Sequence, residues 1–261
     1  GPDGRIALAR FLLGHQLAEE TLGMVQLAID IEPQLAADAH IRSLQGVASY
    51  LMDRPEEAVE YLSAPSLVLD PAADLWRGMV AIDLERWVEA RRRLEAGRAA
   101  AYRYPGVWRA RFEMAEARAA LELGDYAATQ AHLRAIDEHE PDYTTRLYAA
   151  YISARLIAAN GDVYEGVRRL DELSFSGVGP LEARALYDMY RLQLDADLIT
   201  RPEAIEHLEN LRYRWRGDTI ELDTVRTLGE LYVEDGAFAQ GLETMFTAQS
   251  RFPDTEAGRR I

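Results

Sequence analysis

The sequence contains neither cysteine nor lysine among its 261 residues. The absence of cysteine excludes disulfides, thiolate metal sites and cysteine nucleophiles. The absence of lysine means that all 29 basic residues are arginines. Every permanent side-chain cation is therefore a planar guanidinium suited to carboxylates and aromatic faces. Arginine-only usage also favours a bacterial source with a GC-rich genome.

Long apolar runs are absent too, and basic residues are fewer than acidic ones. No window approaches 18 consecutive apolar residues, so we expect no membrane-spanning segment. The 44 acidic residues give a formal net charge of -15, which repels a phosphate backbone and an anionic membrane surface. We therefore expect neither nucleic acid nor a lipid surface as a partner. With 48% hydrophobic residues, the chain has the composition of a folded protein.

Motifs for catalysis and metal binding are missing as well. The pair His132 and His139 has the spacing of one helix face, but a metal site needs at least three converging ligands. The small-residue loop at 174–180 lacks the lysine and the glycine spacing of phosphate and dinucleotide loops. No nucleophile, base and orienting group occur together. We expect no enzyme activity, no cofactor and no metal in this segment.

Proline marks a repeat. Prolines at 33, 71, 105, 141 and 180 lie 34 to 39 residues apart, and Pro253 lies 73 residues beyond Pro180, close to two such intervals. Each interval also contains a break near its middle, such as Gly124-Asp125 or Gly161-Asp162. Apolar residues between the breaks have helical spacing. Pro55 and Pro202 fit the first turn of a second helix, where proline is tolerated.

These breaks predict an α-solenoid of about seven antiparallel helix pairs. Gly1-Pro2 resembles the scar of a cleaved tag, and Pro253 onward reads as the start of a further helix, so we expect a segment of a longer protein. The predicted units, which together form one domain over 1–261, are 3–33, 34–71, 72–104, 105–141, 142–179, 180–217 and 218–253, with the start of a further helix at 254–261.

The last unit carries the clearest family pattern, in which small and large apolar residues alternate. It consists of Leu228, Gly229, Tyr232, Gly236, Phe238, Gly241, Met245, Ala248 and Pro253. This pattern resembles the tetratricopeptide repeat (TPR), and looser matches include Gly46 with Leu62 and Gly78 with Leu94. The resemblance implies an all-α, right-handed TPR-like superhelix. A generic degenerate helix-pair solenoid is the alternative.

The resemblance also implies that the first helices line a concave groove. Aligning the units places Leu75 and Met79 on the groove side, together with the candidate partner-binding residues Arg111, Met114, Arg118, Tyr148, Tyr151, Arg155, Met189 and Gln193. Arginine and tyrosine supply much of the binding energy of protein interfaces, and guanidiniums favour a partner that bears carboxylates. The alternative is that these arginines pair with acids of the chain and that the tyrosines pack between repeats.

Three functions follow from this pattern. The first is a non-catalytic scaffold that binds a protein or peptide in the groove. The second is a structural or oligomerising arm of a bacterial envelope or motility assembly, self-associating through the solenoid ends. The third is a regulatory domain of an enzyme encoded outside this segment. Bacterial cytoplasm and periplasm both suit the chain, including as the soluble part of a membrane-anchored protein. Recognition of chaperone tails, which lysines and asparagines perform in a TPR subfamily, is not expected in a chain without lysine.

Overall fold

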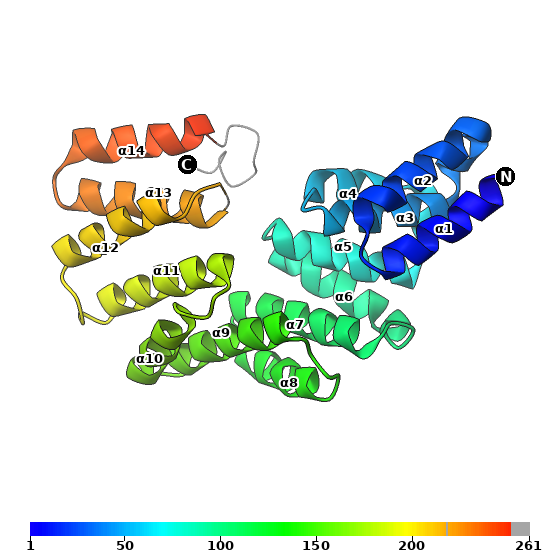
Figure 1. Ribbon diagram of the computed structural model, residues 1–261. Helices are drawn as coiled ribbons and strands as arrows, with labels where there is room; N and C mark the ends of the chain where they lie inside the picture. Colours follow the sequence, from blue (N-terminus) through cyan, green and yellow to red (C-terminus); the bar gives the residue numbers. More distant parts are fainter. Residues whose placement is uncertain (218, 252–261) are drawn as a thin grey trace. The chain divides into compact units, whose positions relative to one another are not determined.

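The computed structural model describes residues 1–217 and 219–251. Within them the chain forms fourteen α-helices and two short 3-10 helices, and no strand (Figure 1). The predicted all-α fold is confirmed, and the helices follow one another as seven pairs. The further helix expected at 254–261 lies outside the described residues.

The chain divides into two compact units, one comprising Gly1–Pro141 and the other beginning at Asp142. The first unit contains four helix pairs: α1 (Pro2–Gly14) with α2 (Ala18–Ile31), α3 (Ala39–Leu51) with α4 (Pro55–Leu62), α5 (Pro71–Asp83) with α6 (Trp87–Ala101), and α7 (Gly106–Glu122) with α8 (Tyr126–Asp137). The 3-10 helices η1 (Pro33–Ala37) and η2 (Pro65–Leu67) precede α3 and α5.

The described residues of the second unit form three pairs: α9 (Tyr143–Ala159) with α10 (Val163–Leu173), α11 (Gly179–Asp195) with α12 (Arg201–Arg214), and α13 (Thr219–Glu234) with α14 (Phe238–Arg251). Here the first helix of each pair contacts the first helix of the next, so that α9, α11 and α13 are successive neighbours. None of the described helices combines the length and the apolar character that a membrane span requires.

One backbone turn recurs in all seven pairs. Each turn contains a single residue with a left-handed backbone, with φ between +55° and +104°. The following N–H donates to a carbonyl five residues earlier, as from Leu17 to Leu12 at 3.0 Å and from Ala237 to Tyr232 at 2.8 Å. This bond closes the end of the first helix. The left-handed residues are Gln16, Asp53, Glu85, Gly124, Gly161, Asp197 and Gly236.

In six of the seven pairs, a small residue seven positions before the turn residue lets the two helices approach closely. A Cβ atom at Gly46, Gly78 or Gly229 would lie 2.5 Å from a side-chain carbon of the partner helix. The partners are Leu62, Leu94 and Met245. Ala9, Ala117 and Ala154 occupy the same position in three other pairs, and each is fully buried. Small and large residues therefore interlock across these six pairs.

The sixth pair departs from this arrangement. Helix α12 begins four residues after the left-handed Asp197, whereas every other second helix begins two residues after its turn residue. Tyr190 stands where the other pairs have glycine or alanine, and its ring stacks on His207 with centroids 4.6 Å apart and planes 5° from parallel. Two extra residues in the turn thus accompany a ring stack in place of the small-residue contact.

Side chains cap the helices where the sequence places aspartate. Asp38, Asp70 and Asp142 accept hydrogen bonds from the first backbone N–H groups of α3, α5 and α9. Such caps satisfy donors that have no partner within the helix. Pro55 opens α4 and Pro202 lies in the first turn of α12, as their positions in the sequence predict.

An aromatic cluster around Trp76 occupies the core of the first unit. The rings of Tyr50, Tyr104, Trp108 and Phe112 lie 4.8 to 6.0 Å from that of Trp76. The Trp76 indole N–H donates to the Tyr104 hydroxyl at 2.9 Å. These rings join α3, α5 and α7 and fix the spacing of the first helices in this unit.

Candidate functional site

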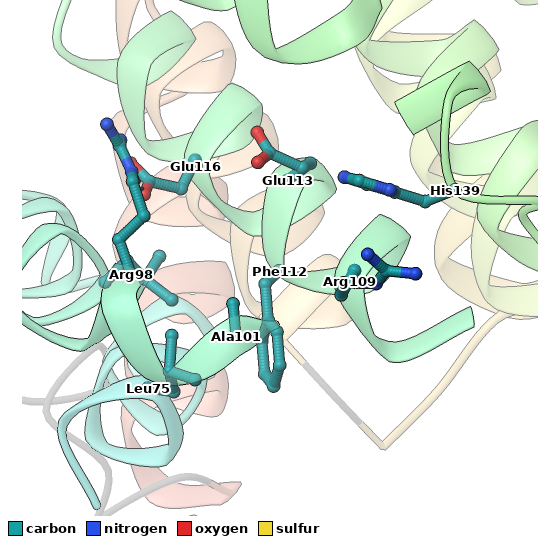
Figure 2. A pocket seen from close by; sticks show the side chains of 9 residues that line it. Leu75, Arg98, Ala101, Arg109, Phe112, Glu113, Glu116 and His139 are labelled. Carbon is teal, nitrogen blue, oxygen red and sulfur yellow. Dashed lines mark hydrogen bonds and ion pairs between the residues drawn. The ribbon is translucent and has the colours of Figure 1, made fainter. Parts of the chain in front are cut away.

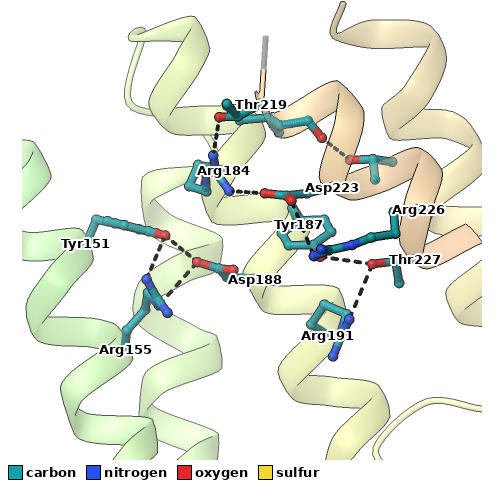
Figure 3. Close-up of polar contacts among 12 residues, drawn as sticks. Tyr151, Arg155, Arg184, Tyr187, Asp188, Arg191, Thr219, Asp223, Arg226 and Thr227 are labelled. Carbon is teal, nitrogen blue, oxygen red and sulfur yellow. Dashed lines mark hydrogen bonds and ion pairs between the residues drawn. The ribbon is translucent and has the colours of Figure 1, made fainter. Parts of the chain in front are cut away.

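The first helices α9, α11 and α13 are joined by sets of contacts among arginine, tyrosine, aspartate and threonine side chains (Figure 3). We call this side of the second unit the arginine face; it comprises Tyr151, Arg155, Arg184, Tyr187, Asp188, Arg191, Thr219, Asp223, Arg226 and Thr227.

The first set of contacts in the arginine face joins α9 to α11. The Tyr151 hydroxyl donates to the Asp188 carboxylate, and the Arg155 Nε lies 3.3 Å from the same oxygen. An Arg155 Nη1 also donates to the Tyr151 hydroxyl at 3.4 Å. Burial raises the pKa of Tyr151, and the Asp188 carboxylate raises it further. Tyr151 therefore stays protonated and acts as a donor.

The second set joins α11 to α13 at their N-terminal ends. Arg184 donates to the Asp223 carboxylate at 2.8 Å and to the Thr219 hydroxyl at 2.9 Å. Only 16% of the Arg184 side chain and 17% of the Asp223 side chain are exposed. Burial lowers the pKa of Arg184, but Tyr151, Asp223 and Asp188 together raise it above its usual value. This guanidinium is therefore a fixed structural cation.

The third set joins α11 to α13 one turn further along. The Tyr187 hydroxyl and the Thr227 hydroxyl lie 2.9 Å apart, and Arg191 donates to the same Thr227 oxygen at 3.3 Å. Arg226, beside Thr227 on α13, donates to Asp223 at 3.4 Å and keeps 43% of its side chain exposed. Burial raises the pKa of Tyr187. The face thus combines four guanidiniums with two carboxylates, Asp188 and Asp223 (Figure 3).

In the first unit, two arginines of α7 lie over tryptophan rings. The Arg111 guanidinium carbon is 4.5 Å from the centre of the Trp108 ring, and that of Arg118 is 5.1 Å from the centre of the Trp87 ring. Asp83 at the end of α5 is exposed, yet the protein around it displaces enough water to raise its pKa to about 6. Arg118 opposes this rise and Asp53 adds to it.

The predicted site residues lie in different surroundings. Tyr151 and Arg155 belong to the arginine face, and Arg111 and Arg118 to the tryptophan stacks of α7. Met114 and Tyr148 are half-buried on α7 and α9. Met189 is 7% exposed on α11, and Gln193 uses its backbone carbonyl to accept the N–H of Leu198. Leu75 and Met79 are buried in the core of the first unit.

The alignment of α11 with its neighbours needs a correction. Counted back from the left-handed turn residues, Tyr151 and Arg155 correspond to Tyr187 and Arg191, not to Met189 and Gln193. The sequence alignment matches this unit to the others through residues of its second helix, α12. Because the α11–α12 turn is two residues longer than the other turns, that alignment displaces α11 by two positions. Counting back from Asp197, the left-handed residue of this turn, places Arg184, Tyr187 and Arg191 on the groove side. Nothing in the sequence marks Asp197 as that residue.

A small pocket of about 40 Å³ lies within the first unit, among α5, α6, α7 and the end of α8 (Figure 2). Arg98, Arg109, Glu113, Glu116 and His139 are its polar lining residues, beside apolar ones such as Phe112. Arg98 donates to Glu116 at 3.0 Å. Among the residues that the structure describes, no three metal-ligating side chains converge. The pocket is too small for more than a water molecule or two.

His132 and His139, which share a predicted helix face, have separate surroundings. The His132 Nδ1 lies 2.7 Å from the Glu113 carboxylate, and its Nε2 lies 3.6 Å from Glu116. His139 follows the end of α8 and lines the pocket. The His132 contacts tie α8 to α7, which is a packing role.

Comparisons with known proteins identify the fold. No model of a known protein family matches the chain, and no curated protein matches it in sequence. Among solved structures, the crystal structure of NprR in complex with its cognate peptide NprX is similar with a TM-score of 0.73 and 12% identity, over 99% of this chain and 80% of that one. The crystal structure of the P58(IPK) TPR domain is matched with a TM-score of only 0.35 and 14% identity, over 99% of this chain and 75% of that one.

Proposed function

Because the chain folds as a TPR-like helical solenoid, we propose that it is a non-catalytic scaffold that binds a protein or peptide partner. The first helices provide the contact surface, and the arginine face of the second unit is its centre. The observation that carries the proposal is the row of arginines and tyrosines across α9, α11 and α13 (Figure 3).

The composition of this face supports the proposal. Arginine and tyrosine are among the residues enriched at the energetically dominant positions of protein interfaces. Their side chains here are held by cross-helix hydrogen bonds, so that little conformational entropy remains to be lost on binding. Arg155 and Arg226 keep 26% and 43% of their side chains exposed and can contact a partner.

The local charge of the arginine face supports an acidic partner. The chain as a whole carries a formal charge of -15, so a local excess of guanidiniums is an electrostatic exception on the molecule. Charge complementarity of this kind steers association and selects among partners. The similarity to NprR contributes the architecture alone, and the residues of this chain supply the chemistry of the proposal.

A selection from a random peptide library displayed on phage tests this function. We expect peptides enriched on the wild-type chain to bind at least about tenfold more weakly to a double variant, Arg155→Ala with Arg191→Ala, because both side chains lie on the arginine face. The matched control is Arg168→Ala, an exposed arginine of the second helix α10 that pairs with Glu165 and Glu172. Equal binding by the double variant and the control, or no enrichment at all, would contradict the proposal.

A second candidate function is the oligomerising arm, and a row of exposed apolar residues on α14 favours it. Phe238, Leu242 and Phe246 follow one another at helical spacing and are 62%, 64% and 70% exposed. Val59, Val167 and Ile205 hold the same position as Leu242 in the second helices of three earlier pairs, and they are only partly exposed. On this candidate, the row on α14 contacts a second copy of the chain.

A further inference from the structure

The arginine face contains the same three-residue arrangement twice, and one of the three residues differs between the two. Tyr151 and Arg155 of α9 meet Asp188 of α11. Tyr187 and Arg191 lie 36 residues further on in the same register of α11, and they meet Thr227 of α13. Asp188 and Thr227 each lie nine residues before the left-handed residue of their own turn. A carboxylate in the first arrangement is therefore replaced by a hydroxyl in the second.

This replacement leaves the second arrangement without a carboxylate among its own three residues. Within the described part of the chain, Arg191 forms no ion pair, and its hydrogen bond goes to the Thr227 hydroxyl. Asp223, four residues before Thr227 on α13, already binds Arg184 at 2.8 Å and Arg226 at 3.4 Å. Glu230, one turn beyond Arg226, is exposed and has no ion pair with Arg191. A hydroxyl oxygen is a weaker partner for a guanidinium than a carboxylate.

We propose that the second arrangement binds a carboxylate of the partner, which supplies at Arg191 the charge that Asp188 supplies at Arg155. The proposal rests on the proposed function and names the chemistry of its ligand: a peptide that bears an acidic group. Arg191 binds the carboxylate, Arg226 adds positive charge beside it, and Tyr187 with Thr227 orients Arg191 (Figure 3). The carboxylate comes from an acidic side chain or from a free C-terminus.

Three short peptides distinguish these sources. The first is the amidated acetyl-Ala-Glu-Ala-Glu-Ala, the second its glutamine counterpart, and the third the glutamine peptide with a free C-terminal carboxylate. Each is titrated to millimolar concentration while the guanidinium NMR signal of Arg191, assigned from an Arg191→Lys variant, is followed. We expect saturable shifts with the first or the third peptide, at least tenfold tighter than with the second. Equal affinity for all three, or no saturable shift with any, overturns the proposal.

A substitution at Thr227 gives the matched test. Thr227→Asp places a carboxylate of the chain itself where the first arrangement has Asp188, so that acidic peptides should bind at least tenfold more weakly. The Thr227→Asn variant has a side chain of nearly the same size as aspartate but without the charge, and it should bind acidic peptides as the wild type does. Circular dichroism checks the fold of both variants. If Thr227→Asp does not fold, loss of binding in Arg191→Gln is the measurement that remains, and unchanged binding there overturns the proposal.

Failure of this inference is distinguishable from failure of the proposed function. Phage-selected peptides that are neutral and amidated, and that still lose affinity when Arg155 and Arg191 are replaced, would leave the scaffold function in place and remove the carboxylate site. If neither selected peptides nor acidic peptides bind, both proposals fall.

Discussion

At the scale of single residues, glycine has opposite effects at two helical positions. A Cβ at Gly97 of α6 would lie 2.6 Å from the backbone nitrogen of Leu75 and 2.8 Å from the carbonyl oxygen of Pro71. Backbone atoms cannot move away as a flexible side chain can. Gly23, in the middle of α2, has no atom within 4 Å of such a Cβ.

Replacing these two glycines by alanine should therefore change stability in opposite directions. We expect Gly97→Ala to lower the free energy of unfolding by about 1 to 3 kcal/mol through overpacking. Gly23→Ala should raise it by about 0.5 to 1 kcal/mol through helix propensity. Urea unfolding followed by circular dichroism measures both. A Gly97→Ala protein as stable as the wild type would show that α6 does not pack so closely on α5.

Asp83 makes stability depend on pH. Its pKa is raised to about 6 by desolvation, from an ordinary value of 3.8. The folded protein therefore binds a proton more tightly than the unfolded chain, and the resulting stability is present below pH 3.8 and lost as the pH rises through 6.

Removing this carboxyl should remove that loss. We expect Asp83→Asn to have a higher melting temperature than the wild type near neutral pH, and the difference should shrink as the pH falls below the ordinary pKa of aspartate. Differential scanning calorimetry at several pH values measures the difference. Asp3→Asn, near the start of α1, is a control of the same chemistry in the same unit. A difference that is constant over this pH range would contradict the assignment to Asp83.

At the scale of the element, the recurring turn explains how the sequence joins the helices of a pair. Glycine occupies the left-handed position in three turns, and Gln16, Asp53, Glu85 and Asp197 occupy it in the others. For a residue with a Cβ atom, the left-handed conformation costs about 1 to 2 kcal/mol. The closing hydrogen bonds and the packing of the pair offset this cost.

Exchanging the residue types tests this account of the turn. Gly124→Ala should lower the free energy of unfolding by about 1 kcal/mol, although no atom lies within 4 Å of the added Cβ, because its φ is +73°. Gln16→Gly, at a φ of +59°, should be neutral or stabilising. Chemical unfolding of both variants beside the wild type gives the two differences. A stabilising Gly124→Ala would mean that the turn adopts another backbone conformation.

At the scale of the whole molecule, the exposed row on α14 makes self-association the property to measure. Phe238, Leu242 and Phe246 expose apolar surface that a second copy would cover. We expect sedimentation velocity at about 0.15 M salt, where charge repulsion is screened, to show concentration-dependent association. Leu242→Glu should abolish it and Thr247→Glu, on the same helix beside the row, should not. A monomer at all concentrations would remove the oligomerising-arm candidate.

The two described units also bear on domain organisation. The sequence predicts one solenoid over the whole chain, and the structure resolves the helix pairs into a unit of four and a unit of three. That both units belong to one continuous superhelix stays a prediction.

The helix pairs could be derived from the sequence because their signals are local. Proline, glycine and aspartate act on the backbone within a few residues of their own position, so Pro55 and Asp142 mark helix starts wherever the helices later pack. The interlocking of Gly78 with Leu94 was visible for the same reason, since both lie in one pair joined by a short turn. The all-α fold and its seven pairs followed from these signals alone.

The arginine face was decided by the tertiary structure. Asp188 meets Arg155 from 33 residues away, and Thr227 meets Arg191 from 36, and no local pattern specifies which carboxylate or hydroxyl completes each contact. The register of α11 depended on the Asp197 turn, where a non-glycine residue adopts a left-handed backbone and two further residues extend the connection. Local propensity determines where helices begin and end, whereas the pairing of side chains between helices depends on how the helices pack.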